Sequence, residues 1–150
     1  METRVERAAE AMAQGFNCSQ AVFITYSDLL GIEDQAMAAR ISSGFGGGFG
    51  RRQEVCGAAS GGVMLVGLKL GVSDPRDKEG KERLYQAVRD FLKDFEDGVG
   101  HLLCRDIVGC NLLTEEGAKE FRERNLSSTV CRDSVRTAAS IIERMLFPHR

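Results

Sequence analysis

The chain has 150 residues, of which 43% are hydrophobic and 28% charged, and its formal net charge is −2. This balance is typical of a globular protein, so we expect residues 1–150 to form one domain and not a disordered or fibrous chain. A nearly neutral charge offers no field to attract nucleic acid or an anionic membrane. The longest apolar run, Val63–Leu68, is far shorter than the roughly 20 residues of a membrane-spanning helix. We therefore expect no membrane insertion and a cytoplasmic location.

The first third of the chain reads as three amphipathic helices. Apolar residues at helical spacing predict a first helix that ends at Gly15. Asn17 can cap a second helix, from about Cys18 to Leu30, which stops at Gly31. A third helix is expected from about Glu33 to Ser43.

The segment Gly44–Gly50 contains five glycines and predicts a tight loop, because so many glycines disfavour a regular helix. It has neither the Gly-Lys-Ser/Thr ending of a P-loop nor a Gly-x-Gly-x-x-Gly frame, which disfavours nucleotide binding. Arg51 and Arg52 could still hold an anion beside the loop.

Two longer helices follow the glycine-rich segment. Val55–Leu70 is apolar on nearly every face, and its length and its Leu, Met and Ala content favour a buried helix over a strand. Ser73, followed by Asp74 and Pro75, predicts the start of the longest helix, which Gly98 and Gly100 end.

The last part of the chain predicts a helical turn at Cys104–Val108, a helix from Thr114 to about Arg124, and a last helix from about Thr129 to Leu146. No pair of strands is convincing. The expected fold class is all-α: a single-domain bundle of about six to seven helices with a glycine-rich loop before the Cys56 helix.

Five cysteines are many for a cytoplasmic chain, where thiols are more often catalytic, redox-sensing or metal-binding than bridged. Four fall within the first turn of a predicted helix: Cys18, Cys56, Cys104 and Cys131. Free N–H groups and the helix dipole favour a thiolate there and could lower each pKa from about 8.5 toward about 7 to 8. The competing interpretation is that each cysteine is simply a small buried hydrophobe.

The spacing of the four cysteines matches no zinc ribbon, ferredoxin or thioredoxin motif, so any site must be assembled by the tertiary structure. Spacing alone cannot distinguish a four-sulfur metal site from redox pairs. Cys110 follows the predicted helical turn and does not lie at a helix start, so we interpret it as an ordinary thiol. His101 could be a ligand or a base, but an exposed loop residue is the simpler interpretation.

Small side chains follow Cys56 for two helical turns, over Gly57–Gly62. Close packing of two helices would explain them. A second explanation is that another sulfur or a bound group must approach Cys56 closely. Both explanations can hold together.

The order of an isolated cysteine, then Cys-Gly-Ala-x-x-Gly, then two isolated cysteines resembles the redox-active C_GCAxxG_C_C family of small prokaryotic proteins. The matching residues are Cys18 within 17–22, the segment Cys56–Gly61, Cys104 within 104–109, and Cys131. The glycine loop before Cys56 is also similar to that of the family. The resemblance covers nearly the whole chain. It implies that the four cysteines act together in redox chemistry, and it names no substrate.

Three functions stay open. In the first, a helix-start thiolate, with Cys56 as the leading candidate, attacks a disulfide or an oxidised partner and a second cysteine resolves the product. Such a thiol-dependent oxidoreductase would act on a partner protein or a small thiol or disulfide. In the second, all four cysteines ligate zinc or an iron–sulfur cluster. In the third, the chain is a non-catalytic helical module that binds a partner or forms a homo-oligomer.

Overall fold

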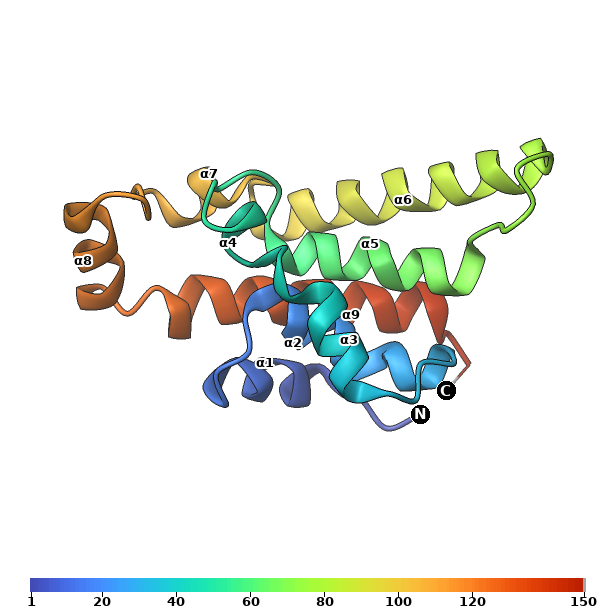
Figure 1. The fold of residues 1–150 in the computed structure, drawn as a ribbon, viewed down its shortest axis with the longest axis horizontal. Helices are drawn as coiled ribbons and strands as arrows, with labels where there is room; N and C mark the ends of the chain where they lie inside the picture. Colours follow the sequence, from blue (N-terminus) through green and yellow to red (C-terminus); the bar gives the residue numbers. More distant parts are fainter. Residues whose placement is uncertain (150) are drawn as a thin grey trace.

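Helices account for nearly all regular structure in the computed structural model, which describes residues 1–149 (Figure 1). In chain order they are α1 (Val5–Ala13), α2 (Cys18–Ser27), η1 (Asp28–Leu30), α3 (Gln35–Ser43), α4 (Gly46–Phe49), α5 (Gly57–Leu70), α6 (Lys78–Val99), α7 (Cys104–Val108), α8 (Glu115–Glu123), η2 (Ser127–Cys131) and α9 (Arg132–Leu146). Within the described range the only strand-like pairing is an isolated bridge between Val55 and Leu103. The all-α prediction is confirmed.

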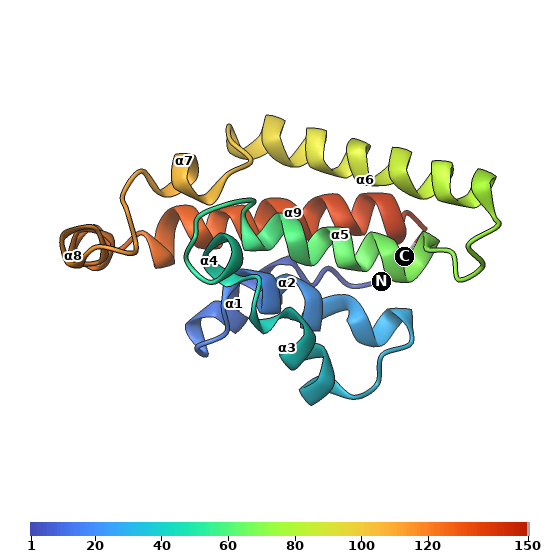
Figure 2. The same cartoon turned by 45° about the horizontal axis from the view of Figure 1, so that its top comes forward.

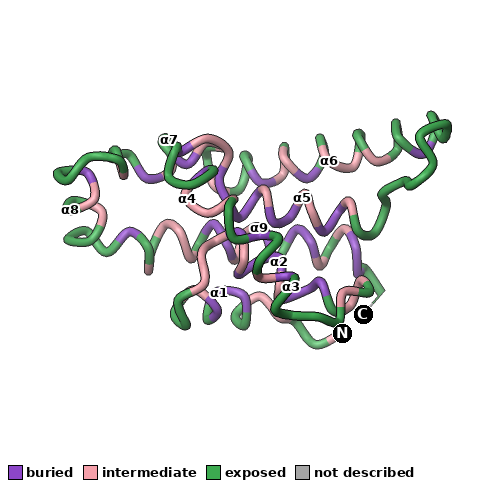
Figure 3. Tube along the Cα trace, in the orientation of Figure 1, coloured by how far each residue is buried: buried purple, intermediate pink, exposed green. Residues whose placement is uncertain are grey.

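The core forms around α5, which packs against α2, α6 and α9 (Figures 1 and 2). Its largest fully buried side chains include Tyr26, Leu65, Phe91 and Phe95. Figure 3 shows the buried positions gathered where α2, α5 and α9 meet. At one end of these helices, α7, α8 and η2 enclose a second, smaller apolar cluster, which contains Cys104.

The second helix begins where its sequence predicts. Asn17 accepts a hydrogen bond from the Gln20 N–H, and the Gln20 side chain accepts one from the Asn17 N–H, both at 3.0 Å. This reciprocal pair is a capping box, which satisfies two N–H groups that the helix leaves free. The helical path stops at Gly31, whose φ of 98° turns the chain out of the helix.

The longest helix begins later than predicted. α6 starts at Lys78, because Asp77 and not Ser73 caps it: the Asp77 side chain accepts a 2.9 Å hydrogen bond from the Gly80 N–H. Asp74 instead pairs with Arg76 in the connection from α5, at 3.1 Å. The far end is as expected, with Gly100 in the left-handed conformation at φ 101°.

The glycine-rich segment folds into one turn, α4, of unusual handedness. Five consecutive residues, Gly47 to Arg51, have φ between 61° and 71°. The turn is closed by the Gly50 N–H, which donates to the Gly46 carbonyl at 2.9 Å. At Gly48 a side chain is excluded twice, because φ is 64° and a Cβ would lie 2.6 Å from the Glu54 nitrogen. The expectation of a tight, irregular loop is confirmed in this form.

No helix among residues 1–149 has both the length and the apolar content that crossing a bilayer requires.

Candidate functional site

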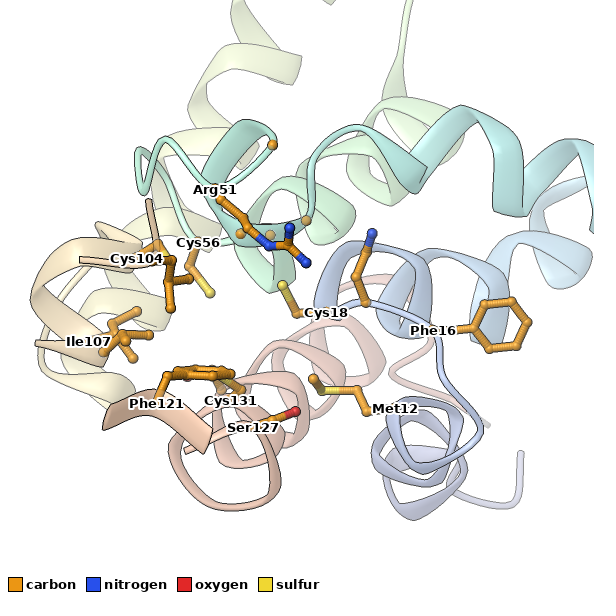
Figure 4. A pocket seen from close by; sticks show the side chains of 18 of the residues that line it. Met12, Phe16, Cys18, Arg51, Cys56, Cys104, Ile107, Phe121, Ser127 and Cys131 are labelled. Atoms are coloured by element: carbon orange, nitrogen blue, oxygen red, sulfur yellow. The ribbon is translucent and has the colours of Figure 1, made fainter. Parts of the chain in front are cut away.

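A cavity of about 440 Å³ lies where the start of α2, the glycine turn, α7 and η2 come together (Figure 4). Four cysteines line it: Cys18, Cys56, Cys104 and Cys131. All are free thiols in this structure. Cys110 lines a separate depression with Arg52, Gln53 and Arg105. The fold thus brings together the four sulfurs that the sequence pattern singled out and leaves the fifth outside.

Cys18 occupies the first position of α2, directly after the Asn17 cap. The backbone N–H groups of Gly47 and Ser19 lie near its sulfur and lower its pKa. The glycine turn reaches this position because the Asn17 side chain also donates to the Ser43 carbonyl at 2.9 Å. Two segments that are separate in the sequence therefore direct N–H groups at one sulfur.

Gly57 explains part of the small-residue run after Cys56. A Cβ at this position would overlap the Cys18 sulfur and lie 3.0 Å from the Phe45 carbonyl oxygen. One turn later, a Cβ on Gly61 would lie 2.7 Å from the Ser19 carbonyl oxygen. Both explanations of the run are therefore correct: Gly57 admits another sulfur, and Gly61 lets α2 and α5 pack closely.

Cys18 and Cys56 form a hydrogen-bonded pair with unequal acidity. The Cys56 thiol donates to the Cys18 sulfur, and this bond is the main reason that the pKa of Cys18 falls from 9.0 to about 6. Burial opposes this fall, and the surrounding N–H groups support it. The pKa of Cys56 is raised well above its ordinary value, because its proton is held by Cys18, burial disfavours its anion, and the Cys18 charge repels it. The fall in pKa that was predicted for both thiols is found at Cys18 and is wrong for Cys56.

Cys104 is held beside Cys56 by paired backbone segments. The Cys56 N–H donates to the Leu102 carbonyl at 2.9 Å, and the Cys104 N–H donates to the Glu54 carbonyl at 2.7 Å. Burial, followed by the charge of Cys18, raises the pKa of Cys104 to about 11, although a hydrogen bond from Gln53 partly offsets this. The predicted helix start is confirmed for Cys104, but the predicted fall in pKa is wrong.

Cys131 does not lie at a free helix start, and this prediction is wrong. The π-helical turn η2 continues directly into α9. Cys131 itself has helical backbone angles of φ −69° and ψ −44°. Its N–H already donates to the Leu126 carbonyl at 3.1 Å. Burial, with the charges of Cys18 and Cys104, raises the pKa of Cys131 to about 12.

Gln53 lies outside the cavity lining but contacts Cys104, and sequence reasoning missed it. It is 5% exposed, has a φ of 60°, and bonds to Cys104 through its side chain. Its amide also donates to the Cys110 carbonyl at 2.8 Å and accepts from the Leu112 N–H at 3.0 Å. Because these partners lie 57 and 59 positions away, no local pattern could have marked Gln53.

The cavity wall is mostly apolar and carries one charge. Arg51 is the only charged residue that lines it within the described chain, and its side chain reaches into the cavity in Figure 4. The lining also contains the polar residues Asn17, Ser43, Ser127 and Ser134 and the apolar side chains of Met12, Phe16, Ile107, Val108, Leu112 and Phe121. His101 lies exposed in a loop outside the lining, as the simpler interpretation expected.

The four cysteines share the cavity without forming a ligand cluster. Among residues 1–149, no group of three or more His, Cys, Asp or Glu side chains is arranged to hold a metal ion. The arrangement instead distinguishes a hydrogen-bonded pair, Cys18 and Cys56, from two thiols whose ionisation burial disfavours, Cys104 and Cys131.

Comparison with known families gives one match. A family model described as "Putative redox-active protein (C_GCAxxG_C_C)" matches residues 16–145, a range that includes all four cavity cysteines. No curated protein and no solved structure matches the chain.

Proposed function

The chain belongs to the C_GCAxxG_C_C family, and from this premise we propose that it is a thiol–disulfide redox protein whose reactive pair is Cys18 and Cys56. The observation that carries the proposal is the hydrogen bond from the Cys56 thiol to Cys18, which lowers the pKa of Cys18 to about 6. The lowered pKa favours the thiolate form of Cys18 near neutral pH. The thiolate is the form that attacks a disulfide.

In the first step, the Cys18 thiolate attacks one sulfur of a substrate disulfide. A new S–S bond forms to Cys18, the substrate S–S bond breaks, and the leaving sulfur departs as a thiolate with the electron pair. Cys18 loses its negative charge in this mixed disulfide. The hydrogen bond and the repulsion that raise the pKa of Cys56 therefore weaken at this stage.

In the second step, Cys56 gives its proton to the departing thiolate or to water and attacks the Cys18 sulfur. The mixed disulfide breaks, a Cys18–Cys56 disulfide forms, and the second substrate thiolate leaves. The pair has then transferred two electrons to the substrate. A small thiol reductant restores the dithiol by the same exchange in reverse.

The test equilibrates the anaerobically reduced protein with dithiothreitol redox buffers, traps free thiols by alkylation, and maps the disulfides by peptide mass spectrometry. We expect one Cys18–Cys56 disulfide that both Cys18→Ser and Cys56→Ser abolish. Cys110→Ser is the matched control, since Cys110 lies outside the cavity, and should oxidise as the parent does. A two-electron oxidation that persists in Cys18→Ser would contradict the proposal.

A second candidate is a zinc or iron–sulfur site with all four cysteines as ligands. All four line one cavity, but among residues 1–149 no three such side chains are arranged to hold a metal ion, so binding would require them to move together. The anaerobically purified protein would then carry metal, or show a charge-transfer absorption band, that is lost with Cys18, Cys56, Cys104 or Cys131. The paired hydrogen bond favours the redox pair, and metal analysis before oxidation separates the two candidates.

A further inference from the structure

We propose that the cavity accepts a small disulfide that carries a carboxylate, and that Arg51 binds this carboxylate while Cys18 attacks the disulfide. The inference rests on the proposed Cys18–Cys56 chemistry and adds to it a class of substrate. It is supported by the exposure of the sulfurs, by the charge of the cavity lining and by the backbone conformation at Arg51.

Access to the sulfurs favours a small molecule. Cys18 is partly exposed and Cys56 is 6% exposed, and both line the cavity, so a disulfide reaches the pair through the cavity. The volume of about 440 Å³ is within the range of roughly 300 to 1,000 Å³ that small-molecule sites occupy. A small disulfide is the substrate that a space of this size favours.

The charge of the lining favours an anion. No acidic side chain lines the cavity within residues 1–149, and Arg51 forms none of the ion pairs in that range. The neighbouring Arg52, by contrast, pairs with Glu54 at 3.4 Å and lines the separate depression that contains Cys110. An unpaired guanidinium at an apolar cavity matches a carboxylate in charge and in bidentate geometry.

The backbone conformation sets the point from which the Arg51 side chain leaves the glycine turn. Arg51 has a φ of 71°, which side-chain-bearing residues seldom adopt. The turn is held by the Gln53 and Glu54 N–H groups, which donate to the Gly47 and Gly48 carbonyls at 3.0 Å. Such conformations persist where the surrounding structure enforces them, and they cluster at binding sites.

The opposite wall indicates where the rest of the substrate would lie. Figure 4 shows Arg51 on one side of the cavity and Phe121, Ile107 and Met12 on the other, with Cys18 between them. A substrate whose carboxylate contacts Arg51 would place its S–S bond near Cys18 and its hydrocarbon part against these apolar side chains. A mixed disulfide of a small mercapto acid and an alkanethiol has this arrangement of groups.

The experiment compares three disulfides of similar length: dithiodipropionate, which is anionic, bis(hydroxyethyl) disulfide, which is neutral, and cystamine, which is cationic. The rate at which the free Cys18 thiol is lost, whether to the mixed disulfide or to the Cys18–Cys56 disulfide, is measured by acid quenching and mass spectrometry. We expect the wild-type protein to react fastest with dithiodipropionate. Arg51→Gln should reduce that rate by roughly tenfold more than the rate with the neutral disulfide. Arg52→Gln, the matched control, should keep the wild-type preference.

The outcomes separate this inference from the proposed function. An equal fall with all three disulfides in Arg51→Gln would mean that Arg51 acts on the thiolate and not on a carboxylate, which overturns the inference and leaves the redox pair standing. Equal wild-type rates would overturn it in the same way. If none of the three reacts at Cys18, the redox pair and the inference both fail. Circular dichroism of each variant checks that the helices are intact.

Discussion

Cys18 and Cys131 line the same cavity and were both expected at helix starts, yet their pKa values shift in opposite directions. The pKa of Cys18 is lowered to about 6, whereas that of Cys131 is raised to about 12. Cys18 lies at a helix start, near the N–H groups of Gly47 and Ser19 and beside the Cys56 thiol. Cys131 continues a helical turn, and its own N–H already donates to the Leu126 carbonyl. Burial acts against the thiolate at both positions.

The comparison shows that proximity to a helix terminus does not by itself make a thiolate. Cys104 does begin a helix, and its pKa is still raised to about 11 because burial outweighs its single side-chain donor. Specific donors aimed at the sulfur decide the outcome. Removing such a donor should therefore raise the pKa of the thiol that it contacts.

The largest expected effect follows Cys56→Ala, which removes the strongest donor to Cys18. The pKa of Cys18 should rise toward its ordinary value of 9.0 or above, because burial is then less well opposed. The midpoint of Cys18 alkylation by iodoacetamide should move to higher pH. The rate at pH 7 should fall by roughly fivefold, because the loss of thiolate outweighs the higher nucleophilicity of a thiolate of higher pKa. Cys56→Ser, whose hydroxyl can still donate, should show a smaller fall. An alkylation profile with an unchanged midpoint in Cys56→Ala would contradict the assignment of the donor.

The pH dependence of stability should change direction near pH 9. Cys18 has a pKa of about 6 when folded against 9.0 ordinarily, so its contribution is complete above about pH 9 and is lost as the pH falls through 6. Cys104 and Cys131 act oppositely: with raised pKa values of about 11 and 12, their contribution is complete below about pH 9 and is lost as the pH rises. Each site contributes a slope of at most about 1.4 kcal/mol per pH unit.

Urea unfolding under reducing conditions, from about pH 6 to about pH 10, measures this dependence. Cys18→Ser should lose the gain in unfolding free energy between about pH 6 and 9 and keep the decline above it. A variant that retains the gain would show that another group is responsible.

A smaller effect is expected from Gly57→Ala, which places a methyl group where the Cys18 sulfur lies. Overpacking should lower the free energy of unfolding by about 1–3 kcal/mol and should raise the pKa of Cys18 by separating it from Cys56. The matched control is Gly67→Ala in the same helix, where a Cβ meets no atom within 4 Å. That change should stabilise the protein by about 0.5–1 kcal/mol. Equal effects of the two substitutions would refute the close approach at Gly57.

The smallest effect is expected from Asn17→Ala, which removes the α2 cap and should lower the free energy of unfolding by about 1 kcal/mol. Thr114→Ala removes the corresponding cap of α8, where the Thr114 hydroxyl accepts from the Gly117 N–H at 3.0 Å, and should have a similar effect. Only Asn17→Ala should also shift the alkylation profile of Cys18, because Asn17 joins α2 to the segment before the glycine turn. The same shift in both variants would point to a general loss of stability.

The sequence was informative where local chemistry decides the structure. The Asn17 cap, the chain reversal at Gly31 and the end of α6 at Gly100 depend on residues within a few positions of one another. The start of α6 was misplaced because Ser73 and Asp77 are both good caps, and only the packed structure selects between them.

The sequence indicated which cysteines line the cavity but not how each of them ionises. The pattern of spaced cysteines identified the four sulfurs that line the cavity. Which of them ionises depends on contacts between distant segments: Cys56 with Cys18, Gly47 with Cys18, and Gln53 with Cys104. The mistaken helix start at Cys131 has a similar origin, because η2 is a wide turn that continues into α9 and leaves no capping signal.

The handedness of the glycine turn has a consequence for motion. A segment rich in glycine usually suggests a flexible linker, but here the residues from Gly47 to Arg51 follow nearly the same left-handed path, with φ of 61° to 71° and backbone bonds at both ends. Gly47, Gly48 and Gly50 allow this left-handed path, which is the mirror image of the one that L-residues prefer, and they do not make the segment flexible. Backbone NMR order parameters in this segment should therefore resemble those of the adjoining helices.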